Sequence, residues 1–482
     1  MKLFFLFLSF ISINVFAQNP PKPYGEVPSK RQLAWHEIEM YGLVHFTPTT
    51  FENKEWGYGD ADPKTFNPTN FNADQIVKAA KAGGLKGIVL VAKHHDGFAL
   101  WPTKTTDYNV TKSPFRNGKG DLVKEMEMAA RKNGLKFGLY CSPWDRNNST
   151  YGTADYLKIY QAQLKELYSN YGELFMSWHD GANGGDGYYG GAKEKRSIDN
   201  TTYYDWTNTW KITRNLQPMA NIFSDIGWDV RWAGNEDGSV NETSWATITP
   251  EPAKGMSVAV PGQSNYEINP SGTRNGKFWM PAECDVPLRQ GWFFHPNEKP
   301  KSVAKLFDLY LKSVGRGANL DLGLAPDTRG QLHEDDVANL KAFGELVSKT
   351  FTNNLAQNAQ FKASNTRGKN YATATLTDKN NGTYWATSDD VHEAQLTIDL
   401  KKSTTFDIIS LQEFIPLGQR IDSFMIEVFE NNQWKKVYIG TSIGSKRLIK
   451  FDTPITANSI KVMLKAPVAI TLSEFGLYKQ AN

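Results

Sequence analysis

Titratable and aromatic side chains recur directly after four short apolar runs of this sequence. In chain order they are His45, Lys93-His94-His95-Asp96, Tyr140 and Trp178-His179-Asp180. If the runs are parallel strands, their carboxyl ends lie together, and that end of a parallel sheet or barrel carries the chemistry. Structural loops would more often show Gly, Asn or Ser there. The pattern therefore predicts one site assembled from separated segments.

Several kinds of catalytic centre are disfavoured by residue spacing. His94 and His95 are adjacent, which tends to point their side chains apart, and no His or Cys pair has the spacing of a zinc site. Ser/His/Asp catalysis lacks its G-x-S-x-G elbow, and no Gly-rich phosphate loop is present. We therefore predict no catalytic metal and no catalytic cofactor, which leaves carboxyl groups as the reactive side chains.

Two carboxyl groups suffice for a retaining glycosidase. One attacks the anomeric carbon, and the other protonates the leaving oxygen and then activates water. Asp180 is the predicted nucleophile, because it ends an apolar strand near Trp178 and opens the Gly-rich segment 181–191. The acid is either Glu236 or Glu283, since each has a tryptophan close in sequence, and aromatic neighbours desolvate a carboxyl group and raise its pKa.

Composition is consistent with a sugar-binding protein and disfavours a polyanion partner. Aromatic residues make up 13% of the 482 residues, and aromatic faces stack on sugar rings as well as filling cores. Glu55-Trp56 is a further carboxylate–aromatic pair that could contact sugar hydroxyls. The net charge of +3 is spread along the chain, so no nucleic-acid partner is expected. Cys141 and Cys284 are expected to be buried free thiols.

Apolar runs and amphipathic segments alternate from residue 38 to about 345. The predicted strands are 41–46, 87–92, 135–140, 174–178 and 220–224, and the predicted helices are 73–82, 122–132, 156–171 and 204–216. This rhythm, with continuously apolar strands, fits a (β/α)₈-like barrel that is irregular in its second half. A doubly wound sheet is the alternative, but it normally carries a Gly-rich turn after its first strand, and HFTPTTF is unlike that turn.

The two ends of the chain differ from this barrel pattern. Residues 1–17 have the charged start, apolar segment and small-residue cleavage site of a signal peptide, so we expect export to the periplasm or the cell exterior. No stretch is long and apolar enough for membrane insertion. We expect the catalytic barrel over 18–350 and an all-β sandwich over 351–482, where short alternating stretches replace helical periodicity.

The motifs taken together resemble glycoside hydrolase family 29, the retaining α-L-fucosidases. The resemblance covers about residues 25–345 and rests on GLVHF, EWGYG, KHHDGF, WHDG, GNEDG and VGRGANLDLG, in the order of the family. It implies that Asp180 is the nucleophile and that a fucosylated glycan is the substrate. The fucose-binding and wall residues that it implies are His45, Glu55, Trp56, His94, His95, Tyr140 and Trp178.

The acid/base is the variable element of that family. GNEDG is similar to the G-N-E segment of the branch that cleaves α-1,3/1,4-linked fucose, which implies Glu236 as the acid/base. The lysine-tryptophan-glutamate-x-cysteine signature of the broad-specificity branch is absent. Its nearest counterpart, Pro281-Ala282-Glu283-Cys284, keeps Glu283 as a rival for the acid and otherwise as a substrate-binding residue. Trp292 is expected to line the site.

The C-terminal sequence resembles a discoidin-like carbohydrate-binding module. The similarity lies in Leu376-Thr377-Asp378 through Gly382-Thr383-Tyr384-Trp385, a region where some such modules bind calcium, so a structural calcium ion stays open. Two alternative functions also stay open. One is another retaining exo-glycosidase, such as a galactosidase, and the other is a non-catalytic glycan-binding protein. Nothing in the sequence indicates an oligomeric state.

Overall fold

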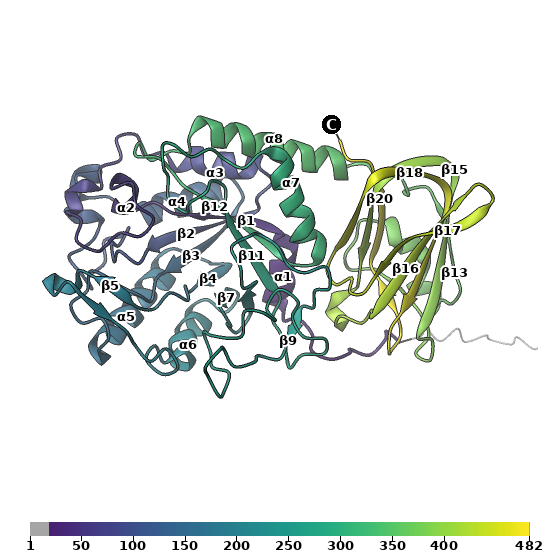
Figure 1. Cartoon of the computed structure of the whole chain (residues 1–482), viewed down its shortest axis with the longest axis horizontal. Coiled ribbons are helices and arrows are strands. Elements are labelled where there is room, and N and C mark those ends of the chain that lie inside the picture. Colours follow the sequence, from purple (N-terminus) through teal and green to yellow (C-terminus); the bar gives the residue numbers. More distant parts are fainter. Residues whose placement is uncertain (1–18, 482) are drawn as a thin grey trace, which may run out of the picture.

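The computed structural model describes residues 19–481, which form two domains lying side by side (Figure 1). The predicted signal peptide, residues 1–17, lies outside the described residues. Over the described range, no helix has both the length and the apolar character needed to cross a bilayer.

Eight parallel strands close the N-terminal domain into a barrel, as the sequence predicts. The strands are β1 (Met40–Val44), β2 (Gly87–Lys93), β3 (Lys136–Cys141), β4 (Met176–Trp178), β7 (Asn221–Ser224), β8 (Val230–Trp232), β11 (Ala282–Pro287) and β12 (Asn319–Leu324). Pairing of β12 with β1 closes the ring. Nearly all of their residues are buried, because one face packs on helices and the other fills the barrel.

Helices cover the outside of most of the barrel. They are α3 (Ala73–Ala82), α4 (Leu122–Lys132), α5 (Ala154–Asn170), α6 (Trp206–Leu216), α7 (Val303–Lys312) and α8 (Glu334–Phe351). The bounds of α3 and α4 match the prediction, because local signals set them. Asn72 and Asp121 cap the first turns through their side chains, and Gly84 and Gly134 adopt positive φ just past the last turns.

The second half of the barrel is irregular. Only residues 225–229 join β7 to β8, and no helix is found in that connection or between β8 and β11. Instead, residues 233–281 form a long loop that contains the small sheet of β9 (Thr247–Ile248) and β10 (Phe278–Trp279). One side of the barrel mouth is therefore built from this loop.

The C-terminal domain is all-β, as predicted. Its strands are β13 (Gln360–Ala363), β14 (Trp385–Ala386), β15 (Glu393–Gln412), β16 (Ser423–Glu430), β17 (Gln433–Gly440), β18 (Arg447–Lys465), β19 (Thr471–Leu472) and β20 (Glu474–Tyr478). Two of these strands are long: β15 has 20 residues and β18 has 19 residues. The pairing of β15 with β18 shifts register after Asp399 and after Phe406, where polar residues interrupt the apolar alternation.

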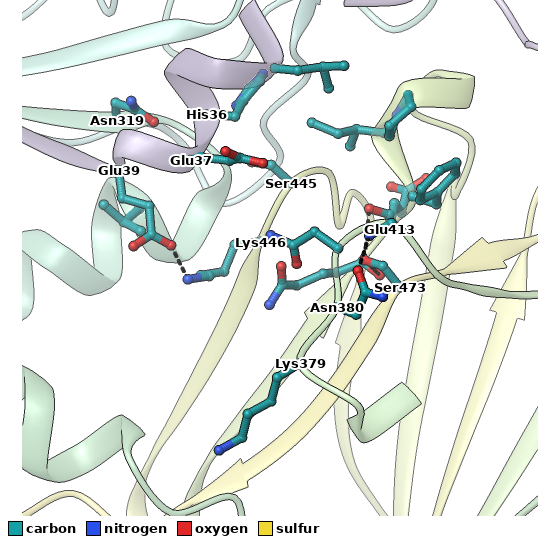
Figure 2. A pocket seen from close by; sticks show the side chains of 18 of the residues that line it. His36, Glu37, Glu39, Asn319, Lys379, Asn380, Glu413, Ser445, Lys446 and Ser473 are labelled. Carbon is teal, nitrogen blue, oxygen red and sulfur yellow. Dashed lines mark hydrogen bonds and ion pairs between the residues drawn. The ribbon is translucent and has the colours of Figure 1, made fainter. Parts of the chain in front are cut away.

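The domains meet at the amino ends of the barrel strands. They enclose a polar cavity of about 650 Å³ there, and Figure 2 shows Lys446 of the C-terminal domain bonded to Glu39, which precedes β1. A second set of contacts holds residues 242–246 of the long loop. The Ser244 amide donates to Ser442 at 2.9 Å, and the Ala246 amide donates to Gln419 at 2.8 Å. The C-terminal domain is thus hydrogen-bonded to the loop that follows β8.

Candidate active site

A second cavity, of about 330 Å³, opens at the carboxyl ends of the barrel strands. This is the end at which barrel enzymes place their chemistry, whereas the larger inter-domain cavity lies at the opposite end. The predicted residues that line the smaller cavity are His45, Trp56, His94, His95, Tyr140, Trp178, Asp180, Glu236 and Trp292. Glu55 and Glu283 are not among its lining residues.

The carboxylate of Asp180, just beyond β4, is oriented by hydrogen bonds. One oxygen accepts from the backbone N–H of Ala182 at 2.7 Å, and the other accepts from the hydroxyl of Tyr140 at 3.1 Å. Burial raises the pKa of Asp180 to about 6, and these two hydrogen bonds partly oppose the rise. The group is therefore ionised at neutral pH and held in a fixed orientation at the cavity.

Three neutral histidines form the β1–β2 side of the cavity. The Ser142 hydroxyl donates to the carbonyl of Trp144 at 2.7 Å, so its oxygen accepts from Nδ1 of His95, also at 2.7 Å. Burial lowers the pKa of His95 to about 3, which leaves Nε2 as an acceptor, 3.8 Å from the Asp180 carboxylate. Burial also lowers the pKa of His45 and His94. A neutral imidazole ring has one N–H donor and one acceptor nitrogen, so it can bind a sugar hydroxyl group, which also both donates and accepts.

Aromatic rings form the remaining walls. Trp178 stacks on Phe223 with centroids 4.3 Å apart and lies 4.9 Å from Tyr140. Trp56 is 50% exposed at the mouth and meets His95 edge-on. Such rings offer faces to the C–H side of a sugar while its hydroxyls reach the polar groups.

Glu55 supports a neighbouring segment. Its oxygens accept from the backbone N–H groups of Trp292 at 3.0 Å and Phe293 at 3.2 Å, and it pairs with Nε2 of His295 at 2.8 Å. A Cβ added to Gly291 would lie 1.9 Å from its Oε1, so the close approach requires glycine. Glu55 therefore positions Trp292, which lines the cavity.

Glu283 lies inside β11, within the barrel wall. It is fully buried and accepts from the indole N–H of Trp178 at 2.8 Å. Burial, together with the neighbouring carboxyl group of Asp321, raises the pKa of Glu283 well above its usual range. Glu283 therefore lies in the barrel interior, where it supports Trp178.

Glu236 lies on the loop after β8 and faces the cavity. Burial raises the pKa of Glu236, the hydrogen bond from Trp292 opposes that rise, and the negative charge of Asp180 adds to it. A carboxyl group that stays protonated to higher pH can donate a proton to a leaving group. The cavity thus combines the oriented carboxyl group of Asp180 with a second carboxyl group, that of Glu236, whose pKa is raised.

Sequence reasoning missed four lining residues whose side chains carry polar atoms: Asp225, Trp232, Tyr266 and Asp285. Asp225 directly follows the predicted strand 220–224, so the strand-end rule that found Asp180 would also have found it. Burial raises the pKa of Asp225 to about 7, and the charge of Asp180 contributes. Tyr266 lies in the long loop, where no periodicity marks it. Asp285 lies in β11, two residues beyond Glu283 and on the same face.

The two cysteines and the possible metal ligands can also be examined in the structure. Cys141 and Cys284 are buried and unpaired, and burial raises the pKa of both thiols, which disfavours thiolate chemistry. Within residues 19–481, no group of three or more His, Cys, Asp or Glu side chains is arranged to hold a metal ion.

Comparisons with known proteins extend over both domains. The family described as "Alpha-L-fucosidase" matches residues 24–350, and the family described as "F5/8 type C domain" matches residues 360–475. The Arabidopsis thaliana protein "Alpha-L-fucosidase 1" is 39% identical, covering 99% of this chain and 93% of its own.

Two solved structures are similar along nearly the whole chain. A putative alpha-L-fucosidase from Bacteroides thetaiotaomicron is 35% identical with a TM-score of 0.86, covering 95% of this chain and 99% of its own. A Ruminococcus gnavus GH29 fucosidase in complex with fucose is 30% identical with a TM-score of 0.85, covering 97% of each chain.

Proposed function

The chain belongs to the α-L-fucosidases of glycoside hydrolase family 29, and we propose that it removes α-1,3- or α-1,4-linked terminal fucose from glycans with retained anomeric configuration. The observation that carries the retaining mechanism is that two carboxyl groups, Glu236 and the hydrogen-bonded Asp180, line one cavity. The GNEDG motif supports the linkage. The signal-like residues 1–17 support action after export.

Two steps would complete the reaction. The Asp180 carboxylate attacks the anomeric carbon of fucose while Glu236 gives its proton to the leaving oxygen, which releases the rest of the glycan and leaves a fucosyl ester on Asp180. Glu236, now a carboxylate, takes a proton from water as that water attacks the ester. Fucose leaves with its original configuration, and both carboxyl groups return to their starting states.

Product analysis tests the linkage and the stereochemistry together. With a Lewis-type trisaccharide, proton NMR during the first minutes should show the α anomer of fucose before mutarotation, because two displacements restore the configuration. Hydrolysis of α-1,2-fucosyl lactose should be much slower under the same conditions. First appearance of the β anomer would rule out the retaining mechanism, and equal rates on the two substrates would rule out the linkage preference.

We also propose that the C-terminal domain holds a structural calcium ion near Asp378. Oε1 of Glu474 is buried there with no hydrogen-bond partner among the described residues, and burial together with the charge of Asp378 raises the pKa of Glu474 to about 7. Two close carboxyl groups, one with an unsatisfied oxygen, suit a hard cation with oxygen ligands. Asp378 and Glu474 would hold the ion, and its charge would stabilise both as carboxylates.

Thermal unfolding of the full chain checks this calcium proposal. One millimolar calcium should raise the unfolding temperature by roughly 2–5 °C relative to chelator, because an ion that binds only the folded state stabilises it. Glu474→Gln should abolish that difference, whereas Glu393→Gln, exposed on β15, should retain it. Identical transitions with calcium and with chelator would contradict the proposal.

A further inference from the structure

The active-site cavity holds more carboxyl groups than the two displacements use. Asp225 and Asp285 line it in addition to the catalytic pair. Asp285 accepts the indole N–H of Trp232 at 2.7 Å. Asp225 is only 8% exposed, and its Oδ2 accepts from the hydroxyl of Tyr266 at 2.7 Å. In the part of the chain that the structure describes, no hydrogen bond engages its Oδ1, so this oxygen can accept a hydrogen bond from a ligand in the cavity.

Asp225 and Tyr266 together span the space between the nucleophile and the acid. A Cβ on Gly181, the residue after the nucleophile, would lie 2.3 Å from Oδ2 of Asp225. A Cβ on Gly234, two residues before the acid and at φ +86°, would lie 2.6 Å from the carbonyl oxygen of Tyr266. The two glycines thus allow the pair to pack against both catalytic loops. In the retaining mechanism the anomeric carbon lies between the two catalytic groups and the leaving oxygen lies on the side of the acid, so a residue packed on the acid's loop, as Tyr266 is, borders the leaving group.

Tyr266 adds an aromatic surface at the mouth of the cavity. Its side chain is 37% exposed, and its ring meets Trp232 at 5.2 Å and 76°. Because the hydrogen bond to Asp285 orients Trp232, the edge-on rings of Trp232 and Tyr266 form a rigid wall beside the Asp225 carboxylate. A ring face next to a hydrogen-bond acceptor matches a sugar, which presents C–H groups on one side and hydroxyls at its edge. The histidines lie on the other side of the cavity, on β1 and β2.

We propose that Asp225 and Tyr266 recognise the sugar from which fucose is cleaved, an inference that rests on the proposed function. Oδ1 of Asp225 accepts a hydrogen bond from a hydroxyl of this leaving sugar. The Tyr266 hydroxyl fixes the carboxylate, and the Tyr266 ring packs on the sugar. The pair is therefore specific for saccharide leaving groups, since an aryl group has no hydroxyl for Asp225 to bind.

The test compares two substrates with one set of variants. For Asp225→Asn, kcat/KM for a Lewis-type trisaccharide should fall roughly 10- to 100-fold more than kcat/KM for 4-nitrophenyl α-L-fucoside, as expected for loss of a charged hydrogen bond. Tyr266→Phe should show a smaller shift of about threefold to tenfold in the same direction, because the ring remains. Product inhibition by the defucosylated disaccharide should weaken more than inhibition by free fucose in both variants.

Tyr203→Phe is the matched control. Its hydroxyl bonds to the backbone of Gly152 and Thr153 outside the cavity, so the substrate ratio should not change. Equal losses on both substrates in folded Asp225→Asn and Tyr266→Phe would overturn the inference, because a purely structural role affects both alike. A wild-type chain that cleaves neither fucoside would instead overturn the proposed function itself, so the two failures are distinguishable.

Discussion

Asp180→Ala should lower kcat for an aryl α-L-fucoside by roughly 10³- to 10⁵-fold, because loss of a covalent nucleophile removes the first displacement. The other carboxyl groups of the cavity cannot replace it. Hydrogen bonds from the Tyr266 hydroxyl and the Trp232 indole hold Asp225 and Asp285, respectively, in place. Steady-state kinetics with 4-nitrophenyl α-L-fucoside measures the effect.

The same experiment has an internal check in its pH dependence. Burial raises the pKa of Asp180 to about 6, and only the carboxylate attacks, so kcat/KM of the wild-type enzyme should fall as pH decreases through about 6. Asp186→Asn, an exposed aspartate on the adjacent loop, should behave as wild type. Turnover by Asp180→Ala within tenfold of wild type would remove Asp180 from the mechanism.

Glu236→Ala should reduce kcat/KM for the trisaccharide by roughly 10²- to 10⁴-fold, because a sugar alkoxide leaves poorly without a proton. The loss should be much smaller with an aryl leaving group, which needs little protonation. Burial raises the pKa of Glu236, so the wild-type profile should decline on the alkaline side as the acid ionises, and this limb should disappear in the variant.

Azide distinguishes Glu236 from Glu283 in the same assay. Added azide should restore turnover of the aryl substrate by Glu236→Ala and give fucosyl azide, since the small anion enters the space left by the carboxyl group. Glu283→Gln keeps an oxygen for the Trp178 indole, so it should retain most of the activity. Azide rescue seen with Glu283→Ala but not with Glu236→Ala would reverse the assignment.

Much of the first half of the fold can be predicted from the sequence because its signals are local. Capping residues and glycines set the ends of α3 and α4, and continuous apolar runs mark β2 and β3. The strand-end rule then places most of the lining residues, because a barrel brings its strand ends together whatever the loops do.

Two parts of the site escape such reasoning for physical reasons. Strand β11 buries Glu283 and Asp285 inside the barrel, so its sequence looks like that of a polar loop, and only the closed sheet shows otherwise. Tyr266 reaches the cavity because a long loop without helix packs against Gly234. Contacts of this kind depend on tertiary packing, which no periodicity of the sequence encodes.

The hydrogen bonds between the C-terminal domain and residues 242–246 limit how this enzyme can be truncated or recombined with other domains. Those residues begin six residues after Glu236 and lie in the same loop as Glu236 and Tyr266, so the β-sandwich supports part of the active site. A cut at residue 350 would remove Ile408 and Leu448 from the hydrophobic core of the barrel and would also break the contacts with residues 242–246. A different β-sandwich domain in this position would therefore need the contacts that Gln419, Ser442 and Arg447 make with the loop. Without these contacts, the exchanged domain would change catalysis although it does not contact the sugar.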